Sequence, residues 1–196
     1  MIINPYVFAA AGAGGTAWNP ADKGTLITLT NSNLTATGSG SGNTCVRGVA
    51  HHTAGKYYYE LTVNAIAGTN YPRFGVGDSA VPLTGNGSGA GLVMAVIQVS
   101  PAFTFVGNSA IASGVTYVVN DIMQFAVDLT ASKIWFGKNN TWILSGNPAA
   151  GTNESRLLTA GADYYPFGCC QGTAQITARF ASASWTYAAP SGFLEW

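Results

Sequence analysis

The stretch DIMQFAVDLTASKIWFGKNNTW, residues Asp121–Trp142, consists of two strand-length apolar runs joined by a short polar turn. Side chains of an extended chain alternate between its two sides, and the apolar ones recur here at Phe125, Val127 and Leu129, then at Ile134, Trp135 and Phe136. Thr130-Ala131 can reverse the chain, and Asn139-Asn140 can supply the positive φ values of a second turn before Trp142. The stretch therefore predicts a three-stranded antiparallel meander whose aromatic side chains pack on the faces of a sheet.

Runs of similar length recur along the whole chain. They cover residues 25–29, 44–50, 56–63, 73–77, 92–99, 103–106, 115–119, 122–129, 133–137, 165–171 and 174–181, and stretches rich in Gly, Asn, Ser and Pro separate them. No helical period persists beyond about two turns. Many short strands between turns predict an all-β fold with antiparallel sheets, without internal repeats or an interdomain linker.

The charge content is the most unusual feature of the composition. Lys plus Arg number 8 and Asp plus Glu number 8 among 196 residues, so the formal net charge is zero, and the basic residues are scattered. A phosphate backbone would find no basic stripe, which excludes nucleic acid as a partner. Because only 8% of the residues are charged, copies of the chain repel one another little, and we expect a homo-oligomer or a place within a larger assembly.

The composition also excludes a membrane-spanning or a disordered protein. The longest apolar run, GLVMAVIQV at 91–99, is far shorter than the roughly 18 residues of a membrane helix. Hydrophobic residues make up 47% of the chain and aromatic residues 12%, which is enough apolar surface for a packed core.

Several segments, in this order, resemble the SPRY domain family. They are GKYYYELTV (55–63), FGVGD (74–78), NDIMQFAVDLTASKIWFGKNN (120–140) and YYPFGCC (164–170). The resemblance covers Trp18–Trp196 and implies one antiparallel two-sheet β-sandwich, SPRY-like and of the concanavalin-like jelly-roll type. In that family, loops at one end of the sandwich form a protein-binding surface, and the corresponding loops here are 64–72, 79–91, 107–114 and 145–163.

A narrower likeness concerns the two ends of this region. WNPADKGTLITLTNSNLTAT (18–37) and ASWTYAAPSGFLEW (183–196) are similar to parts of SPRY-like proteins encoded by tailed bacteriophages. This likeness implies a non-enzymatic virion protein, located in the head decoration, the neck, the baseplate or a fibre tip and assembled in the host bacterial cytoplasm. Its partners would be other virion proteins, or a protein or glycan of the host surface.

Four polar positions have structural interpretations. Asn120 and Asn140 stand where the family pattern has glycine, and both suit turns because Asn enters the left-handed region more readily than most residues. Glu60 and Asp128 fall at strand positions of the family pattern, where the resemblance implies that a carboxylate accepts hydrogen bonds from backbone or hydroxyl groups. We therefore predict structural rather than catalytic roles for these two acids.

The cysteines Cys45, Cys169 and Cys170 are odd in number and lack the spacing of a disulfide framework. This pattern predicts reduced, buried thiols. Cys169 and Cys170 are adjacent, and neighbours on a strand point to opposite faces, so they should neither join each other nor bind one metal together.

The sequence shows no catalytic constellation. His51 and His52 are neighbours, so on a strand they cannot both bind one metal without a bulge, although one of them can pair with Cys45 or an acid. No nucleophile-elbow motif is present, and the glycine strings GSGSGN and GNGSGAG lack the Lys and the helix of a phosphate loop. We expect no enzymatic activity, no cofactor and no metal.

Loop residues are the candidates for binding. Tyr71 and Trp142 stand beside turn residues in GTNYPR and NNTW, and Asn86 lies in the glycine-rich loop 79–91. Exposed aromatic rings can also stack on sugars. The alternative function is therefore a carbohydrate-binding module or lectin that recognises a bacterial surface polysaccharide through Tyr71 and Trp142.

The first 17 residues are predicted to be an attachment segment that precedes the β-sandwich domain 18–196. MIINPYVFAAAGAGG lacks the positive region of a signal peptide, and its apolar residues, among them Ile3, Tyr6 and Phe8, precede a tether of Ala and Gly. We predict that these three residues contact a neighbouring virion subunit. In the alternative, they pack on their own domain.

Overall fold

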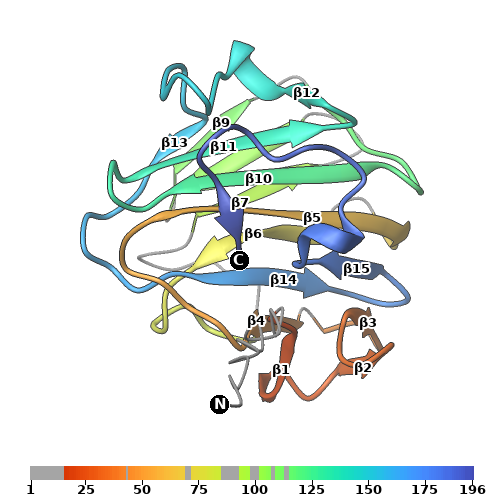
Figure 1. Ribbon diagram of the computed structural model, residues 1–196. Coiled ribbons are helices and arrows are strands. Elements are labelled where there is room, and N and C mark those ends of the chain that lie inside the picture. Colours follow the sequence, from red (N-terminus) through yellow and green to blue (C-terminus); the bar gives the residue numbers. More distant parts are fainter. Residues whose placement is uncertain are drawn as a thin grey trace, which may run out of the picture.

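The computed structural model describes residues 16–42, 44–68, 72–84, 93–97, 102–106, 109–112 and 115–196, the three short ranges between 93 and 112 as backbone only. These residues form a sandwich of two sheets (Figure 1). No helix within these ranges is both long and apolar enough to cross a membrane. The predicted all-β, two-sheet sandwich is thereby confirmed.

The first sheet is antiparallel throughout. Its strands, in spatial order, are β1 (Trp18–Lys23), β4 (Thr44–Gly48), β14 (Tyr165–Cys170), β6 (Arg73–Gly77), β7 (Val93–Ile97), β8 (Ala102–Val106) and β9 (Ser109–Ala112). β1 contains Pro20, which cannot donate a backbone hydrogen bond and therefore suits the edge position that this strand occupies.

The second sheet carries the predicted meander. Its strands, in spatial order, are β12 (Thr141–Trp142), β11 (Lys133–Lys138), β10 (Ile122–Asp128), β5 (Lys56–Ala65), β15 (Gln175–Arg179), β3 (Thr35–Gly38) and β2 (Ile27–Thr30). Two short strands pair beside this path: β13 (Arg156–Leu157) with β11, and β16 (Leu194–Glu195) in parallel with β5. The short 3-10 turns η1 (Ile143–Ser145) and η2 (Ser182–Ser184) complete the described elements.

The main core lies between the sheets. Phe125 stands opposite Phe136 on one neighbouring strand and opposite Tyr59 on the other. The Tyr59 and Phe125 rings stack at 4.6 Å, and the Tyr59 hydroxyl donates a hydrogen bond of 2.6 Å to the Gly75 carbonyl in the first sheet. The aromatic residues of the meander thus connect the two layers, as the alternating pattern predicted.

A second core lies on the outer face of the second sheet. Tyr58, Ala126 and Trp135 point away from the main core and are buried under the C-terminal segment, which contributes Phe193 and Trp185. In Figure 1 this segment crosses β10 and β11 before it reaches β16. The Trp135 indole Nε1 donates a hydrogen bond of 2.8 Å to the Thr152 carbonyl. Both faces of the central strands are therefore covered.

The prediction of a strand at 115–119 is wrong. This stretch contains no strand because the Asp121 carboxylate accepts a hydrogen bond of 2.8 Å from the Val118 N–H, and Asn120 turns the chain with φ 74°. Val118 and Val119 are 62% and 45% exposed. The hydrogen bond from Val118 to the Asp121 side chain therefore prevents a strand here, although the stretch is rich in β-branched residues. The sequence did not predict the strands β1, β3, β9, β13 and β16.

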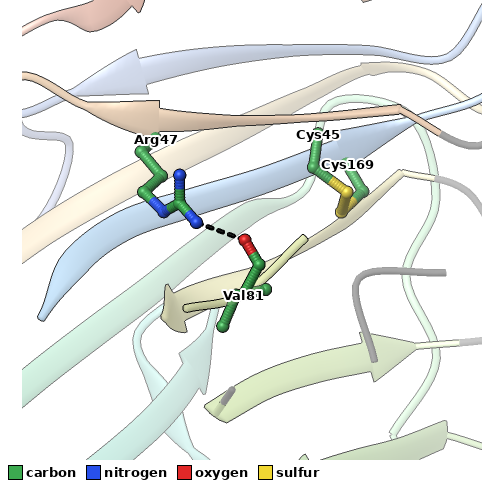
Figure 2. Close-up of a disulfide and its surroundings, with 4 residues drawn as sticks. All are labelled: Cys45, Arg47, Val81 and Cys169. Carbon is green, nitrogen blue, oxygen red and sulfur yellow. Dashed lines mark hydrogen bonds between the residues drawn. A yellow bond between two sulfur atoms is a disulfide. The ribbon is translucent and has the colours of Figure 1, made fainter. Parts of the chain in front are cut away.

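The prediction of reduced thiols is wrong for two of the three cysteines. Cys45 on β4 stands directly opposite Cys169 on β14, and the two form a disulfide (Figure 2). They are 124 residues apart in sequence, so only the pairing of β4 with β14 brings them together. Cys170 remains a buried free thiol, and burial raises its pKa to about 12. Cys169 and Cys170 do not join each other, as predicted.

Arg47 lies two residues after Cys45 on the same side of β4 and holds the chain after β6 against the first sheet. Its guanidinium forms an ion pair of 2.9 Å with Asp22. It also donates to the carbonyls of Asp78, Ser79 and Val81, the last of which is drawn in Figure 2. These partners compensate a guanidinium in a residue that is only 5% exposed.

Candidate functional site

A hollow of about 510 Å³ opens at the β12 edge of the second sheet. This edge lies at one end of the sandwich, at the top in Figure 1. The lining residues come from the segment before β10, from β11 with its turn, and from β12 with η1: Val115, Thr116, Lys138, Asn139, Thr141, Trp142, Ile143 and Leu144.

The turn between β11 and β12 positions Trp142. Asn139 and Asn140 have φ values of 48° and 66°, so the left-handed conformation predicted for Asn140 is confirmed, as is that of Asn120. The turn brings Trp142 opposite Gly137, where a Cβ atom would lie only 3.0 Å from the indole ring. Glycine at 137 therefore makes room for the ring that lines the hollow.

The polar side chains of the hollow are largely satisfied by the protein itself. Lys138 Nζ donates a hydrogen bond of 2.8 Å to the Thr116 carbonyl and lies 3.5 Å from the Asp121 carboxylate. The Asn139 side chain donates to Asp121 and accepts from the Ile122 N–H. The groups left for a ligand are mainly apolar, namely the partly buried Trp142 and the 45% exposed Leu144.

Leu144 has an unusual backbone conformation. Its φ of 57° and ψ of 33° place it in the left-handed region, which costs an L-residue with a Cβ atom about 1–2 kcal/mol. A bulky residue in this region is an outlier, and such strain gathers at binding sites. The chain thus holds an exposed leucine at the hollow in a conformation that glycine would adopt without strain.

We expect Leu144→Gly to raise the free energy of unfolding by about 0.5–1 kcal/mol, because relief of the left-handed strain exceeds the entropic cost of glycine. Urea denaturation measures the change. Leu157→Gly is the matched control, since Leu157 is a 60% exposed leucine on β13, and this variant should be destabilised by about 0.5–1 kcal/mol. An equal loss in both variants would contradict the strain at Leu144.

A chain of buried hydrogen bonds runs from the β11–β12 turn to the C-terminal segment. The Asn140 N–H donates to Gln124 Oε1 at 2.7 Å, and Gln124 Nε2 donates to the Tyr58 hydroxyl at 2.9 Å. The Tyr58 hydroxyl donates to Glu60, whose carboxylate also accepts from the Thr186 and Tyr187 N–H groups. Burial raises the pKa of Tyr58 far above its ordinary value, so the hydroxyl stays a donor.

The structural roles predicted for the two strand acids are confirmed. Glu60 is fully buried and accepts the three hydrogen bonds just described. Asp128 accepts a hydrogen bond of 2.8 Å from the Ala131 N–H in the β10–β11 turn, and Lys56 Nζ lies 3.1 Å from it. Asp128 thus holds the β10–β11 turn in place, and Glu60 fastens the C-terminal segment to β5.

Of the predicted binding residues, the structure places Trp142 in the hollow. It lies on the short strand β12, partly buried, rather than in a loop. Tyr71, Asn86, Ile3, Tyr6 and Phe8 are outside the described residues. Sequence reasoning missed Leu144 and Lys138, and the only local signal was an apolar Ile-Leu pair directly after Trp142.

The two histidines have separate partners. His51 Nδ1 lies 2.5 Å from the Asp163 carboxylate, and the half-exposed ring stacks on Tyr165. Of the two partners that the sequence left open for a histidine, Cys45 or an acid, the structure shows the acid. His52 stacks on Tyr57, with ring centroids 3.7 Å apart, next to Trp196. Within the described ranges, no three His, Cys, Asp or Glu side chains are arranged to bind a metal ion.

We expect His52 to make the fold less stable in acid. Burial, and to a lesser degree the neighbouring His51, lower the pKa of His52 below its ordinary 6.5, against the opposing charge of Asp163. The unfolded chain then binds a proton more readily than the folded protein. The contribution of His52 is therefore fully present above pH 6.5 and is lost as the pH falls through the folded-state pKa.

Melting temperatures of the wild type and of His52→Phe, which keeps a ring against Tyr57, measure this effect between about pH 7 and pH 5. The wild type should lose more stability than the variant over this range. Parallel curves would show that His52 does not contribute.

No protein-family model matches the sequence, and the sequence matches no curated protein. Solved structures are similar in fold. The SPRY domain of human HERC1 superposes with a TM-score of 0.65 at 14% identity, over 83% of this chain and 97% of that domain. The PSpry domain of TRIM65 gives a TM-score of 0.64 at 13% identity, over 84% of this chain and 91% of that one. The SPRY-like fold implied by the order of the segments is therefore confirmed.

Proposed function

We propose that this chain is a non-enzymatic virion protein of a tailed bacteriophage, whose SPRY-like sandwich binds other virion proteins or the host surface through the hollow at β12. The likeness of residues 18–37 and 183–196 to phage proteins supports the assignment to a virion. The SPRY-like fold supports protein partners, which in this family bind loops on a rigid sandwich. The hollow lies at the β11–β12 turn and η1, next to the predicted binding loop 145–163 rather than within it.

The observation that carries the binding role is the exposed Leu144 beside Trp142 at the rim of the hollow. A side chain held in a strained conformation and half in water weakens the fold, which is understandable if a partner covers it. Engagement of Glu60 and Asp128 in structural hydrogen bonds supports a binding rather than a catalytic role. The Cys45–Cys169 disulfide suits a particle that persists in oxidising surroundings.

Virions that carry a labelled copy of this chain test the proposal. Imaging should place the label on the head, the neck, the baseplate or a fibre tip. Leu144→Asp should reduce incorporation or adsorption to host cells, whereas Leu157→Asp, which changes an exposed leucine outside the hollow, should leave both unchanged. Virions without the label would refute the virion assignment.

A lectin is the second candidate, because Trp142 lines the hollow together with Thr141. An aromatic ring beside a hydroxyl group is a surface on which a sugar can stack and form a hydrogen bond. A glycan array of bacterial polysaccharides decides between the candidates. If the chain binds a glycan and Trp142→Ala abolishes that binding, the lectin is favoured. If it binds none of the polysaccharides, the protein-binding role is favoured.

A further inference from the structure

We infer that the hollow at β12 receives the N-terminal segment of a second copy of this chain. This inference rests on the proposed function of the hollow as a protein-binding surface, and it names the partner. It would join copies head to tail, with residues 1–8 of one copy in the hollow of the next.

The chemistry of the hollow suits this occupant. The four apolar lining residues are Val115, Trp142, Ile143 and Leu144, and Lys138 is the one charged residue among those that line it. The Lys138 ammonium already has the Thr116 carbonyl at 2.8 Å and the Asp121 carboxylate at 3.5 Å. An acidic partner is therefore not needed to balance it, and an apolar segment without charged side chains can cover the hollow without leaving the Lys138 charge unpaired.

The N-terminal segment has the complementary composition. Residues 1–8, MIINPYVF, contain no charged side chain and six large apolar ones, namely Met1, Ile2, Ile3, Tyr6, Val7 and Phe8. Pro5 lacks a backbone donor and favours an extended chain. The following residues Ala9–Gly15 are all Ala or Gly, a composition typical of tethers, and can extend over roughly 25 Å.

The domain starts at the end opposite its own hollow. The Thr16 hydroxyl accepts a hydrogen bond of 2.7 Å from the Ala50 N–H, and the Ala17 carbonyl accepts one from Val49. These bonds hold the beginning of β1, which packs beside β2. β2 and β12 are the opposite edges of the second sheet, and Figure 1 shows β1 and β12 at opposite ends of the sandwich. The tether therefore joins the domain at the end away from its own hollow, which favours a neighbour's hollow as the site that the segment enters.

Such a contact joins two different surfaces of identical chains. Repeated, it closes into a ring or continues as a filament, depending on the rotation between copies. The formal net charge of zero and the 8% content of charged residues leave little electrostatic repulsion between stacked copies.

The test measures the mass of the full-length chain in solution, by analytical ultracentrifugation, for two complementary variants. Phe8→Glu places a charge on the segment, so that it can no longer enter an apolar hollow. Leu144→Glu places a charge in the hollow, so that it can no longer receive an apolar segment. Each variant alone should remain at the 20.2 kDa of one chain, while the wild type forms larger species. An equimolar mixture should form dimers and nothing larger, because one variant keeps a working hollow and the other a working segment.

Leu157→Glu is the matched control, since it places the same charge at an exposed leucine outside the hollow, and it should assemble like the wild type. A wild type that stays monomeric, or a Leu144→Glu variant that assembles normally, would overturn the inference. If the segment packs on its own domain, Phe8→Glu will lower the melting temperature and the mixture will form no dimers, which also overturns it. Binding of the monomeric wild type to other virion proteins would then leave the proposed function intact.

Discussion

Replacing Trp135 with alanine is expected to lower the free energy of unfolding by about 3–5 kcal/mol, the largest effect of any single substitution considered. The side chain is fully buried in the outer core beneath the C-terminal segment, where it meets Phe193 with ring centroids 6.3 Å apart. The substitution leaves a cavity and also removes the hydrogen bond from Nε1 to the Thr152 carbonyl. Urea denaturation, with the midpoint and slope fitted together, measures the loss.

Trp142→Ala is the matched control on the same sheet. Trp142 is only partly buried and lies at the margin of the same cluster, so its truncation should cost clearly less, about 1–2 kcal/mol. An unchanged melting temperature for Trp135→Ala would show that this side chain does not belong to a core, and the assignment of the outer face would be wrong.

The second large effect is expected from the disulfide. It joins residues 124 positions apart, so it restricts the unfolded chain strongly, and removal of such a bridge costs about 2–5 kcal/mol. We expect this loss for the double variant Cys45→Ala with Cys169→Ala, measured by urea denaturation under non-reducing conditions. Cys170→Ala removes a buried thiol without touching the bridge and should cost about 1 kcal/mol.

Thiol counting provides an independent check of the same bridge. The unfolded, unreduced protein should react at one cysteine, Cys170, and the reduced protein at all three. Three reactive thiols without reduction would show that Cys45 and Cys169 are not joined, and the double variant should then lose much less stability.

The meander could be predicted from the sequence because its signals are local. Alternation at Phe125 and Val127, and two Asn residues that accept positive φ, are properties of neighbouring positions. The stretch 115–119 shows the limit of this reasoning. Its composition favours a strand, but the side chain of Asp121 captures the Val118 N–H and turns the chain. A side chain and a neighbouring strand compete here for the same backbone N–H group, and the outcome depends on local geometry that the composition does not show.

The candidate site could be predicted only in part. Trp142 was selected because it stands next to turn residues, and it does line the hollow. Leu144 and Lys138 were missed, because their importance depends on how η1 and the segment at Val115 and Thr116 lie across β11. These segments are more than 20 residues apart in the chain, and no periodicity links them.

The amino-acid sequence alone determined the all-β class, the central meander, the turn asparagines and the structural roles of Glu60 and Asp128, all of which depend on short-range patterns or on an ordered set of motifs. Only the tertiary structure decided which side chains meet across long distances in sequence. Cys45 joins Cys169 because β4 pairs with β14, and Trp135 is buried on the outer face because the C-terminal segment returns over it. Alternation places Trp135 and Phe136 on opposite faces of one strand, but whether a face is covered depends on packing between segments that local sequence does not encode.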